Sequence, residues 1–157
     1  MPTPIEPRTD GKGRRIAIVA ARFTQAITQI LLDDAVLALR TQGVDENDIT
    51  IAWVPGSFEL PLTCEIFASS GSVDGVIALG CVIRGETSHY DYVCESAAKG
   101  ILETGLRHRI PVIFGVLTTE DRAQALARAD GTKSSKGAEC ADAVLTMIGT
   151  VEAIRTR

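Results

Sequence analysis

Four short runs of apolar, mostly β-branched residues recur along the chain, and longer amphipathic stretches separate them. Their composition is that of strands buried on both faces of a sheet. The runs cover residues 14–20, 49–54, 73–83 and 111–117. Strands that alternate with helices predict an α/β fold, in which a four-stranded parallel sheet lies between two helical layers as a three-layer α/β/α sandwich.

The intervening stretches have helical spacing. Apolar residues from Ile27 to Leu39 recur on one helix face, and the pattern stops at Gly43. Pro61 falls in the first turn of the next expected helix, where proline is tolerated. After the first helix, further helices are expected over residues 57–69, 88–107, 120–129 and 140–154.

A chain of 157 residues is long enough for one hydrophobic core and too short for two comfortable ones. Its first residues include Pro2, Pro4 and Pro7, which remove backbone donors and exclude a helix there. We therefore expect an N-terminal arm over residues 1–13 and a single α/β domain over residues 14–157.

The net charge of −4 argues against nucleic acid or an anionic membrane as a partner, because both select a basic face. The apolar runs end well before the roughly 18–20 residues that cross a bilayer, and the N-terminus lacks the apolar segment of a secretory signal. A cytoplasmic protein is expected. Its four cysteines are widely spaced without a C-x-x-C pair, so free thiols are expected in place of a zinc site.

Polar residues concentrate where the third strand meets the long helix, over residues 80–92. Backbone N–H groups at a helix start attract anions. The Gly80-x-x-x-x-Gly85 spacing matches the phosphate loop of an NTPase, but Glu86 stands where that loop needs a lysine. A smaller phosphate bound near Gly85 and Thr87 is the remaining interpretation, with a plain helix cap by Thr87 or Ser88 as the alternative.

His89 lies in the first turn of the same helix, where the positive end of the helix dipole favours a neutral imidazole. It is therefore a candidate for proton transfer, although a lone histidine is often structural. Glu59 lies at another helix start, where it could bind the hydroxyls of a ligand or stabilise the helix dipole.

In a parallel sheet, ligands bind beyond the carboxyl ends of the strands, and several further residues are expected on that rim. Phe23 and Phe114 could stack there on a planar heterocycle, or belong to the core. Arg128, Lys133 and Lys136 form a basic stretch in an otherwise acidic chain, which could complete an anion pocket or lie in solvent.

Four motifs follow one another in the order found in a known enzyme family. They are Pro55-Gly56-Ser57-Phe58-Glu59-Leu60-Pro61, Gly80-x-Val82-Ile83-Arg84-Gly85-x-Thr87-x-His89-Tyr90-Asp91-Tyr92-Val93, Pro111-Val112-Ile113-Phe114-Gly115-Val116-Leu117-Thr118-Thr119 and Lys136-Gly137. From about Arg14 to its C-terminus, the chain resembles the 6,7-dimethyl-8-ribityllumazine synthases. The resemblance implies a flavodoxin-like fold and a transferase of riboflavin biosynthesis that needs neither cofactor nor metal. The implied reaction condenses 5-amino-6-(D-ribitylamino)uracil with 3,4-dihydroxy-2-butanone 4-phosphate, and it releases phosphate and water.

The resemblance also implies a role for each matching position. For the pyrimidine substrate, Phe23 would stack on the ring, Ser57, Phe58 and Glu59 would hold the ribityl chain, and Cys81, Val82 and Ile83 would bind the uracil edge. For the butanone phosphate, the contacts would be Glu86, Thr87 and Arg128, with Lys136 as a further candidate. His89 would shuttle protons, and Phe114 would close the pocket.

The implied assembly is a homo-oligomer built from pentamers, in which Phe114 and Arg128 reach the site from the neighbouring subunit. Residues 131–135 depart from the Gly-Thr-Lys-Ala-Gly-Asn common in shell-forming members. The sequence therefore leaves open whether the pentamer is complete or builds an icosahedral shell of sixty subunits, which could enclose riboflavin synthase. Two rival functions also stay open, a module that binds flavin or a phosphorylated heterocycle without turnover, and a shell protein without activity.

Overall fold

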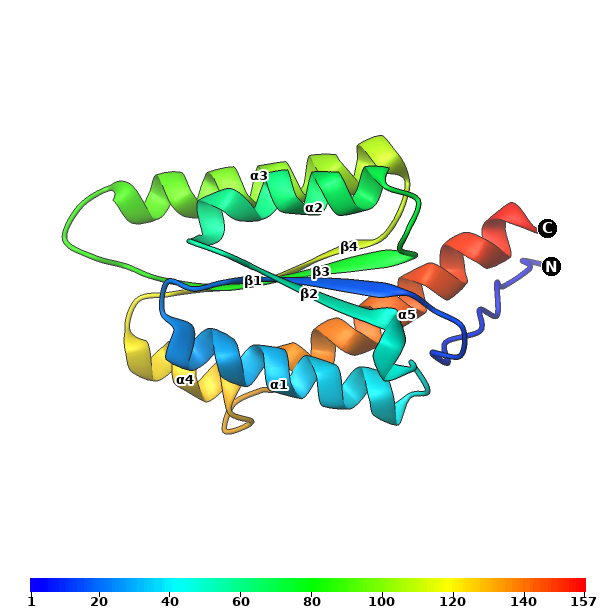
Figure 1. The fold of residues 1–157 in the computed structure, drawn as a ribbon, viewed down its shortest axis with the longest axis horizontal. Coiled ribbons are helices and arrows are strands. Elements are labelled where there is room, and N and C mark those ends of the chain that lie inside the picture. The colour runs from blue at the N-terminus through cyan, green and yellow to red at the C-terminus, as the bar shows by residue number, and fades with distance from the viewer.

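Four parallel strands form one sheet in the order β2-β1-β3-β4, in a computed structural model that describes residues 1–157 (Figure 1). The strands are β1 (Ile16–Ala21), β2 (Ile49–Val54), β3 (Gly75–Ile83) and β4 (Val112–Thr119). The chain runs from β1 to β2 on one side and then crosses to β3 on the other side of β1. The strand order therefore reverses between β1 and β3. In open α/β sheets, that reversal marks the crevice where ligands bind.

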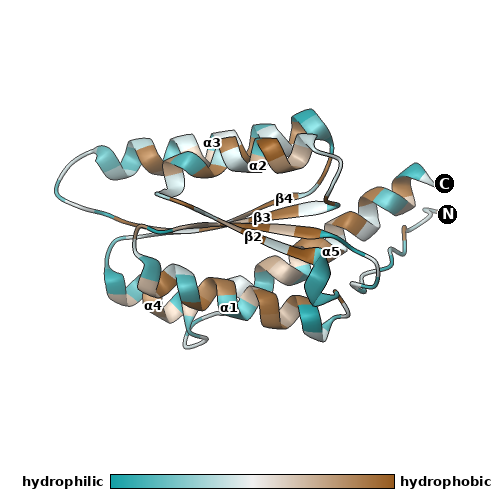
Figure 2. Ribbon diagram, in the orientation of Figure 1, coloured by the Kyte–Doolittle hydropathy of each residue, from teal (hydrophilic) through white to brown (hydrophobic).

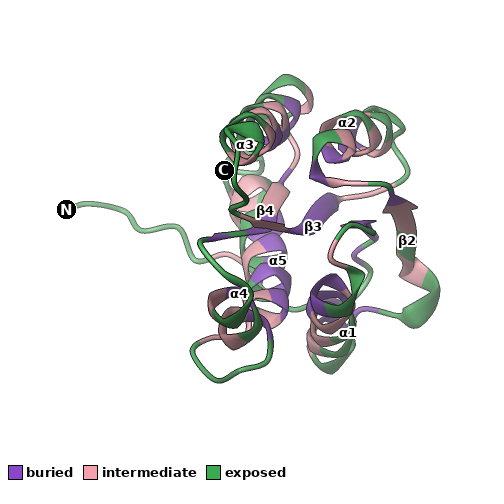
Figure 3. Cartoon of the chain, turned by 90° about the vertical axis from the view of Figure 1, so that its left-hand side faces the viewer, coloured by how far each residue is buried: buried purple, intermediate pink, exposed green.

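Helices cover both faces of the sheet, as the predicted three-layer α/β/α sandwich requires. One layer contains α2 (Leu60–Ser69) and α3 (His89–His108), and the other contains α1 (Gln25–Thr41), α4 (Arg122–Ala129) and α5 (Lys136–Arg155). Figure 3 shows the two layers end-on, with the sheet between them. Two short 3₁₀ helices, Glu46–Asp48 and Ser57–Glu59, precede β2 and α2.

The core is divided into two apolar clusters by the sheet. Successive residues of β1 alternate between them, with Ile16 and Ile18 facing α1 and α5, and Ala17 and Val19 facing α2 and α3. All six residues of β1 are buried, because this strand is central and helices cover both of its faces. Figure 2 shows the same pattern, with apolar colour on the strands and on the helix sides that face them. Burying one Ile side chain contributes about 2 kcal/mol, so β1 is a large part of the core's stability.

The last helix begins four residues earlier than the sequence predicts, at Lys136 in place of Cys140. Gly137 lies in this added first turn, where α5 approaches α1 so closely that a Cβ would collide with the carbonyl oxygen of Leu31. The second expected helix also differs at its start, since residues Ser57–Glu59 form a 3₁₀ turn before α2 begins.

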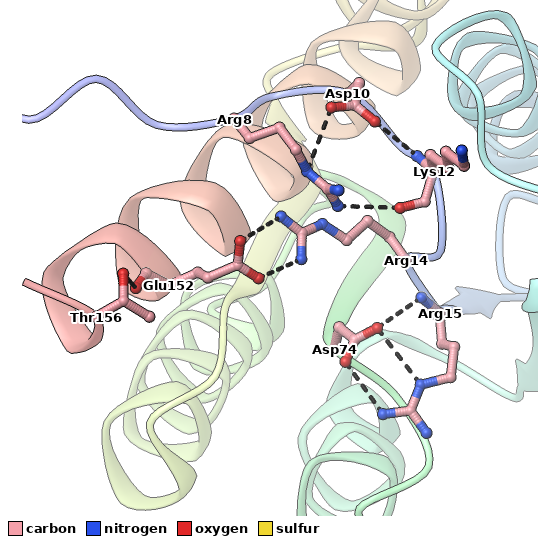
Figure 4. A network of polar contacts seen from close by, with 8 residues as sticks. All are labelled: Arg8, Asp10, Lys12, Arg14, Arg15, Asp74, Glu152 and Thr156. Atoms are coloured by element: carbon pink, nitrogen blue, oxygen red, sulfur yellow. Dashed lines mark hydrogen bonds and ion pairs between the residues drawn. The ribbon is translucent and has the colours of Figure 1, made fainter.

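The N-terminal arm joins the domain near the end of α5 (Figure 4). Gly149 leaves room for the backbone of Arg8, and the N–H of Gly11 donates to the carbonyl of Gln42 at 2.8 Å. Arg14, which is buried, donates to the two carboxylate oxygens of Glu152 at 2.6 and 3.3 Å. The residues before Pro7 are exposed and extend away from the body. None of the helices has both the length and the apolar character needed to span a bilayer.

Candidate functional site

A large cavity lies at the carboxyl ends of β1, β2 and β3, where the strand order reverses. Its volume of about 750 Å³ falls in the range typical of small-molecule sites. The 3₁₀ turn after β2 forms one wall, and the end of β3 with the start of α3 forms the other. The lining residues are Phe23, Pro55, Gly56, Ser57, Phe58, Glu59, Cys81, Val82, Ile83, Gly85, Thr87, His89, Tyr90 and Val93.

Two phenylalanines lie at the mouth of this cavity. Phe23 is 76% exposed and Phe58 is 61% exposed, so neither belongs to the core. The parallel pairing of β1 with β2 continues beyond the strands, because the N–H of Phe23 donates to the carbonyl of Pro55 at 2.9 Å. Thr24 then adopts the left-handed region with φ 63°, which turns the chain into α1. Phe23 is thus fixed by its backbone while its ring remains free for a ligand.

Ser57 lies deeper in the same cavity. Its side chain is buried, and its Oγ faces Gly80 of β3, where a glycine leaves room for it. Glu59 follows at the end of the 3₁₀ turn and also lines the cavity. The predicted triplet of Ser57, Phe58 and Glu59 therefore lies together on one wall.

The opposite wall carries the end of β3. Cys81 is 1% exposed, and burial raises the pKa of its thiol to about 11. The thiol stays protonated at neutral pH and is a poor nucleophile. Because its side chain is enclosed, Cys81 offers a ligand only its backbone N–H and C=O groups. Val82 and Ile83 line the cavity beside it.

The first turn of α3 brings Thr87 and His89 to the cavity. The backbone N–H of His89 donates to Thr87 Oγ1 at 3.3 Å, whereas Ser88 makes no side-chain capping bond. Of the two predicted caps, Thr87 is therefore the one that bonds to the helix start. His89 itself is exposed and lines the cavity.

A second cavity, of about 530 Å³, lies along the outer edge of β4 and under the connection from α4 to α5. It contains Phe114, Arg128, Lys133 and Lys136, and it shares no lining residue with the first cavity. The first cavity has no lysine or arginine among its lining residues. The predicted site residues therefore fall into two groups, one with the histidine and one with the cations.

Phe114 and Glu86 both lie outside the first cavity. Phe114 was expected on the rim beyond the strands, and this was wrong: it is the third residue of β4, where it pairs with Ala78 of β3. The strand continues to Thr119 because pairing with β3 extends to Ile83. Glu86 is exposed on the loop before α3 and lines neither cavity.

The sequence profile of the 6,7-dimethyl-8-ribityllumazine synthase family matches residues 13–152. The chain belongs to this family. A curated 6,7-dimethyl-8-ribityllumazine synthase from Pediococcus pentosaceus is 48% identical over 139 residues, which cover 88% of this chain and 89% of the relative. The family match over residues 13–152 includes every lining residue of both cavities and begins at the end of the N-terminal arm.

Tyr90 and Val93 also line the first cavity of this lumazine synthase, although sequence reasoning assigned them no role. Both belong to the longest family motif and lie in the first turns of α3, just after His89. Their spacing of three residues from one another places them on one helix face, and this was the available signal.

Proposed function

We propose that this member of the family condenses 5-amino-6-(D-ribitylamino)uracil with 3,4-dihydroxy-2-butanone 4-phosphate at a site shared between two subunits. In this proposal, the first cavity of one subunit faces the second cavity of its neighbour in a homopentamer. The observation that carries it is the separation of His89 from Arg128 and Lys136 into cavities without a common residue. A site that holds a phosphate dianion needs cations, and the first cavity alone supplies none.

The pyrimidine substrate would occupy the first cavity. Phe23 offers an exposed ring for stacking, and Ser57 with Glu59 offers hydrogen-bonding groups for the ribityl hydroxyls. Backbone groups of residues 81–83 would bind the edge of the uracil. Phe114 of the neighbour would close the cavity over the ring.

The butanone phosphate would lie near the start of α3. Backbone N–H groups of residues 85–87 and the Thr87 hydroxyl would bind the phosphate together with Arg128 of the neighbour, and Lys136 would add a second cation. Glu86 is exposed on the same loop and would contact this substrate only in the assembled site.

The chemistry requires positioning and proton transfer more than a strong nucleophile. The amine of the pyrimidine attacks the ketone, water leaves to give an imine, and loss of a proton drives out the phosphate. Loss of phosphate leaves an enol at the carbon that carried the remaining hydroxyl, and this enol becomes a ketone. Attack of the second nitrogen on that ketone then closes the ring with loss of a second water. His89 would carry the protons between these steps, and Arg128 would stabilise the departing phosphate.

The direct test is to incubate the purified protein with both substrates, follow the fluorescent lumazine, and measure the mass of the assembly by sedimentation. We expect product and phosphate to form in equal amounts, and a particle of five subunits or a multiple of five. A monomer with full activity would overturn the shared site. A flavin-loaded protein that forms no lumazine would overturn the reaction.

A further inference from the structure

Arg84 is the first residue after β3, and it contacts two parts of the chain at once. Its Nε donates to Glu120 Oε2 at 2.7 Å, and its backbone N–H donates to the carbonyl of Thr119 at 2.9 Å. These two partners lie at the end of β4. On the other side, its Nη1 donates to Asp91 Oδ1 at 3.3 Å, and its guanidinium lies 4.3 Å from the ring centre of Tyr90.

The loop that follows makes no hydrogen bond to the sheet. Residues 85–88 are exposed, and their backbone and side chains make hydrogen bonds only within the loop and to the first turn of α3. Figure 1 shows the connection from β3 to α3 extending beyond the rest of the molecule. Arg84 and its partners therefore join the loop and the first turn of α3 to the end of β4, in addition to the packing of α3 on the sheet through Ala97 and Ile101.

The exposure of Arg84, Asp91 and Glu120 indicates that their contacts fix local geometry and add little to global stability. Arg84 is 41% exposed, and Asp91 and Glu120 are 59% and 61% exposed. Ion pairs this exposed contribute little to global stability. A planar guanidinium that bonds two carboxylates and stacks on a ring nevertheless fixes geometry, which the ammonium group of a lysine does less well.

We propose that Arg84 is a positioning residue, which joins the first turn of α3 to the end of β4 and so fixes Thr87 and His89 in the site. The effect on catalysis rests on the function proposed above, whereas the effect on the loop does not. Since a displacement of the order of 1 Å is enough to slow an enzyme severely, loss of this contact should reduce kcat while the pyrimidine still binds.

The experiment compares Arg84→Gln and Arg84→Lys with the wild type and with Arg15→Gln. Arg15 is a matched control, because it forms a comparable exposed pair with Asp74 at the opposite end of the sheet, with Nη2 to Oδ1 at 3.1 Å. For each protein, kcat and the KM of both substrates are measured, along with amide hydrogen exchange over residues 85–92.

For Arg84→Gln we expect kcat to fall about tenfold with the KM of the pyrimidine changed less than about twofold, and Arg84→Lys to recover part of the loss. Exchange over residues 85–92 should rise in Arg84→Gln and stay at the wild-type level in Arg15→Gln. Wild-type exchange and wild-type kcat in Arg84→Gln would overturn the proposal. If the wild type made no lumazine, the reaction proposed above would fail, and exchange alone would decide whether Arg84 fixes the loop.

Discussion

Gly80 of β3 lies against the side chain of Ser57, so that a Cβ added at Gly80 would come within 2.5 Å of Ser57 Oγ. This contact joins the two walls of the first cavity, because Gly80 precedes Cys81 and Ser57 begins the 3₁₀ turn. The glycine is required here by the space that the hydroxyl occupies, since Gly80 is not among the residues with positive φ.

Gly80→Ala should therefore displace Ser57 from the cavity. Overpacking of a buried site typically costs about 1–3 kcal/mol, and the KM of the pyrimidine should rise because the ribityl chain loses a partner. Urea unfolding and steady-state kinetics measure the two effects. Gly75→Ala is the control for kinetics, because a Cβ there would overpack the start of β3 against Val144, away from the cavity. An unchanged KM in Gly80→Ala would contradict the assigned role of Ser57.

Phe23→Ala should affect binding without affecting the fold. Because the ring is 76% exposed, its removal should leave the thermal midpoint nearly unchanged. The KM of the pyrimidine should rise about tenfold, as expected when an aromatic stack worth about 1 kcal/mol and its contact area are lost. Leu37→Ala, at a 65% exposed position on α1, controls for the loss of an exposed apolar side chain. Equal kinetics in both variants would remove Phe23 from the site.

His89→Ala and Arg128→Ala should each reduce kcat about 100-fold or more, since one loses the proton carrier and the other a phosphate contact. Co-expression of the two variants tests whether the site is shared. In mixed rings, about a quarter of the sites would combine an intact His89 with an intact Arg128 from the neighbour. Activity should then recover well above that of either variant alone. No recovery in assembled mixed rings would show that both residues act within one chain.

Acid should weaken the contact between Asp74 and Arg15. Burial alone would raise the pKa of Asp74, but hydrogen bonds from the Arg15 side chain and backbone N–H outweigh it and lower the pKa below its ordinary value of 3.8. A carboxylate with a lowered pKa stabilises the fold above the unfolded pKa, and this stabilisation is lost as the pH falls through the folded pKa.

Asp74→Asn should accordingly be less stable than the wild type at pH 7, by at most about 1 kcal/mol for a partly exposed pair. The difference should shrink as the pH falls below about 4. Urea unfolding at a fixed protein concentration between pH 3 and pH 7 measures it. A difference that stays constant over this range would rule out the titration of Asp74 as its source.

The strands were the most predictable part of the fold. Residues 49–54 form β2 as the sequence predicts, because a β-branched run ends at Pro55-Gly56, a pair that punctuates the chain locally. β3 begins two residues later than predicted, at Gly75, because Asp74 bonds to Arg15 instead of extending the strand. Such shifts of a strand boundary depend on contacts between residues that are distant in sequence. A pattern along the chain does not show these contacts.

The first cavity was also predictable from sequence, since the family motifs carry Ser57, Thr87 and His89 and a parallel sheet places their loops on one rim. The position of Phe114 was predicted less well. Its place within the expected strand over residues 111–117 already argued against the rim, and pairing of β4 with β3 as far as Thr119 puts the strand end two residues further from it.

Both chain termini lie at the end of the molecule opposite the loops that form the first cavity (Figure 1). The arm follows the end of α5, and Gly149 with the pair of Arg14 and Glu152 joins the two segments there. A protein fused to either terminus would therefore be attached at the end of the molecule opposite the cavity mouth. This chain offers two neighbouring attachment points for cargo that leave the entrance for substrate uncovered.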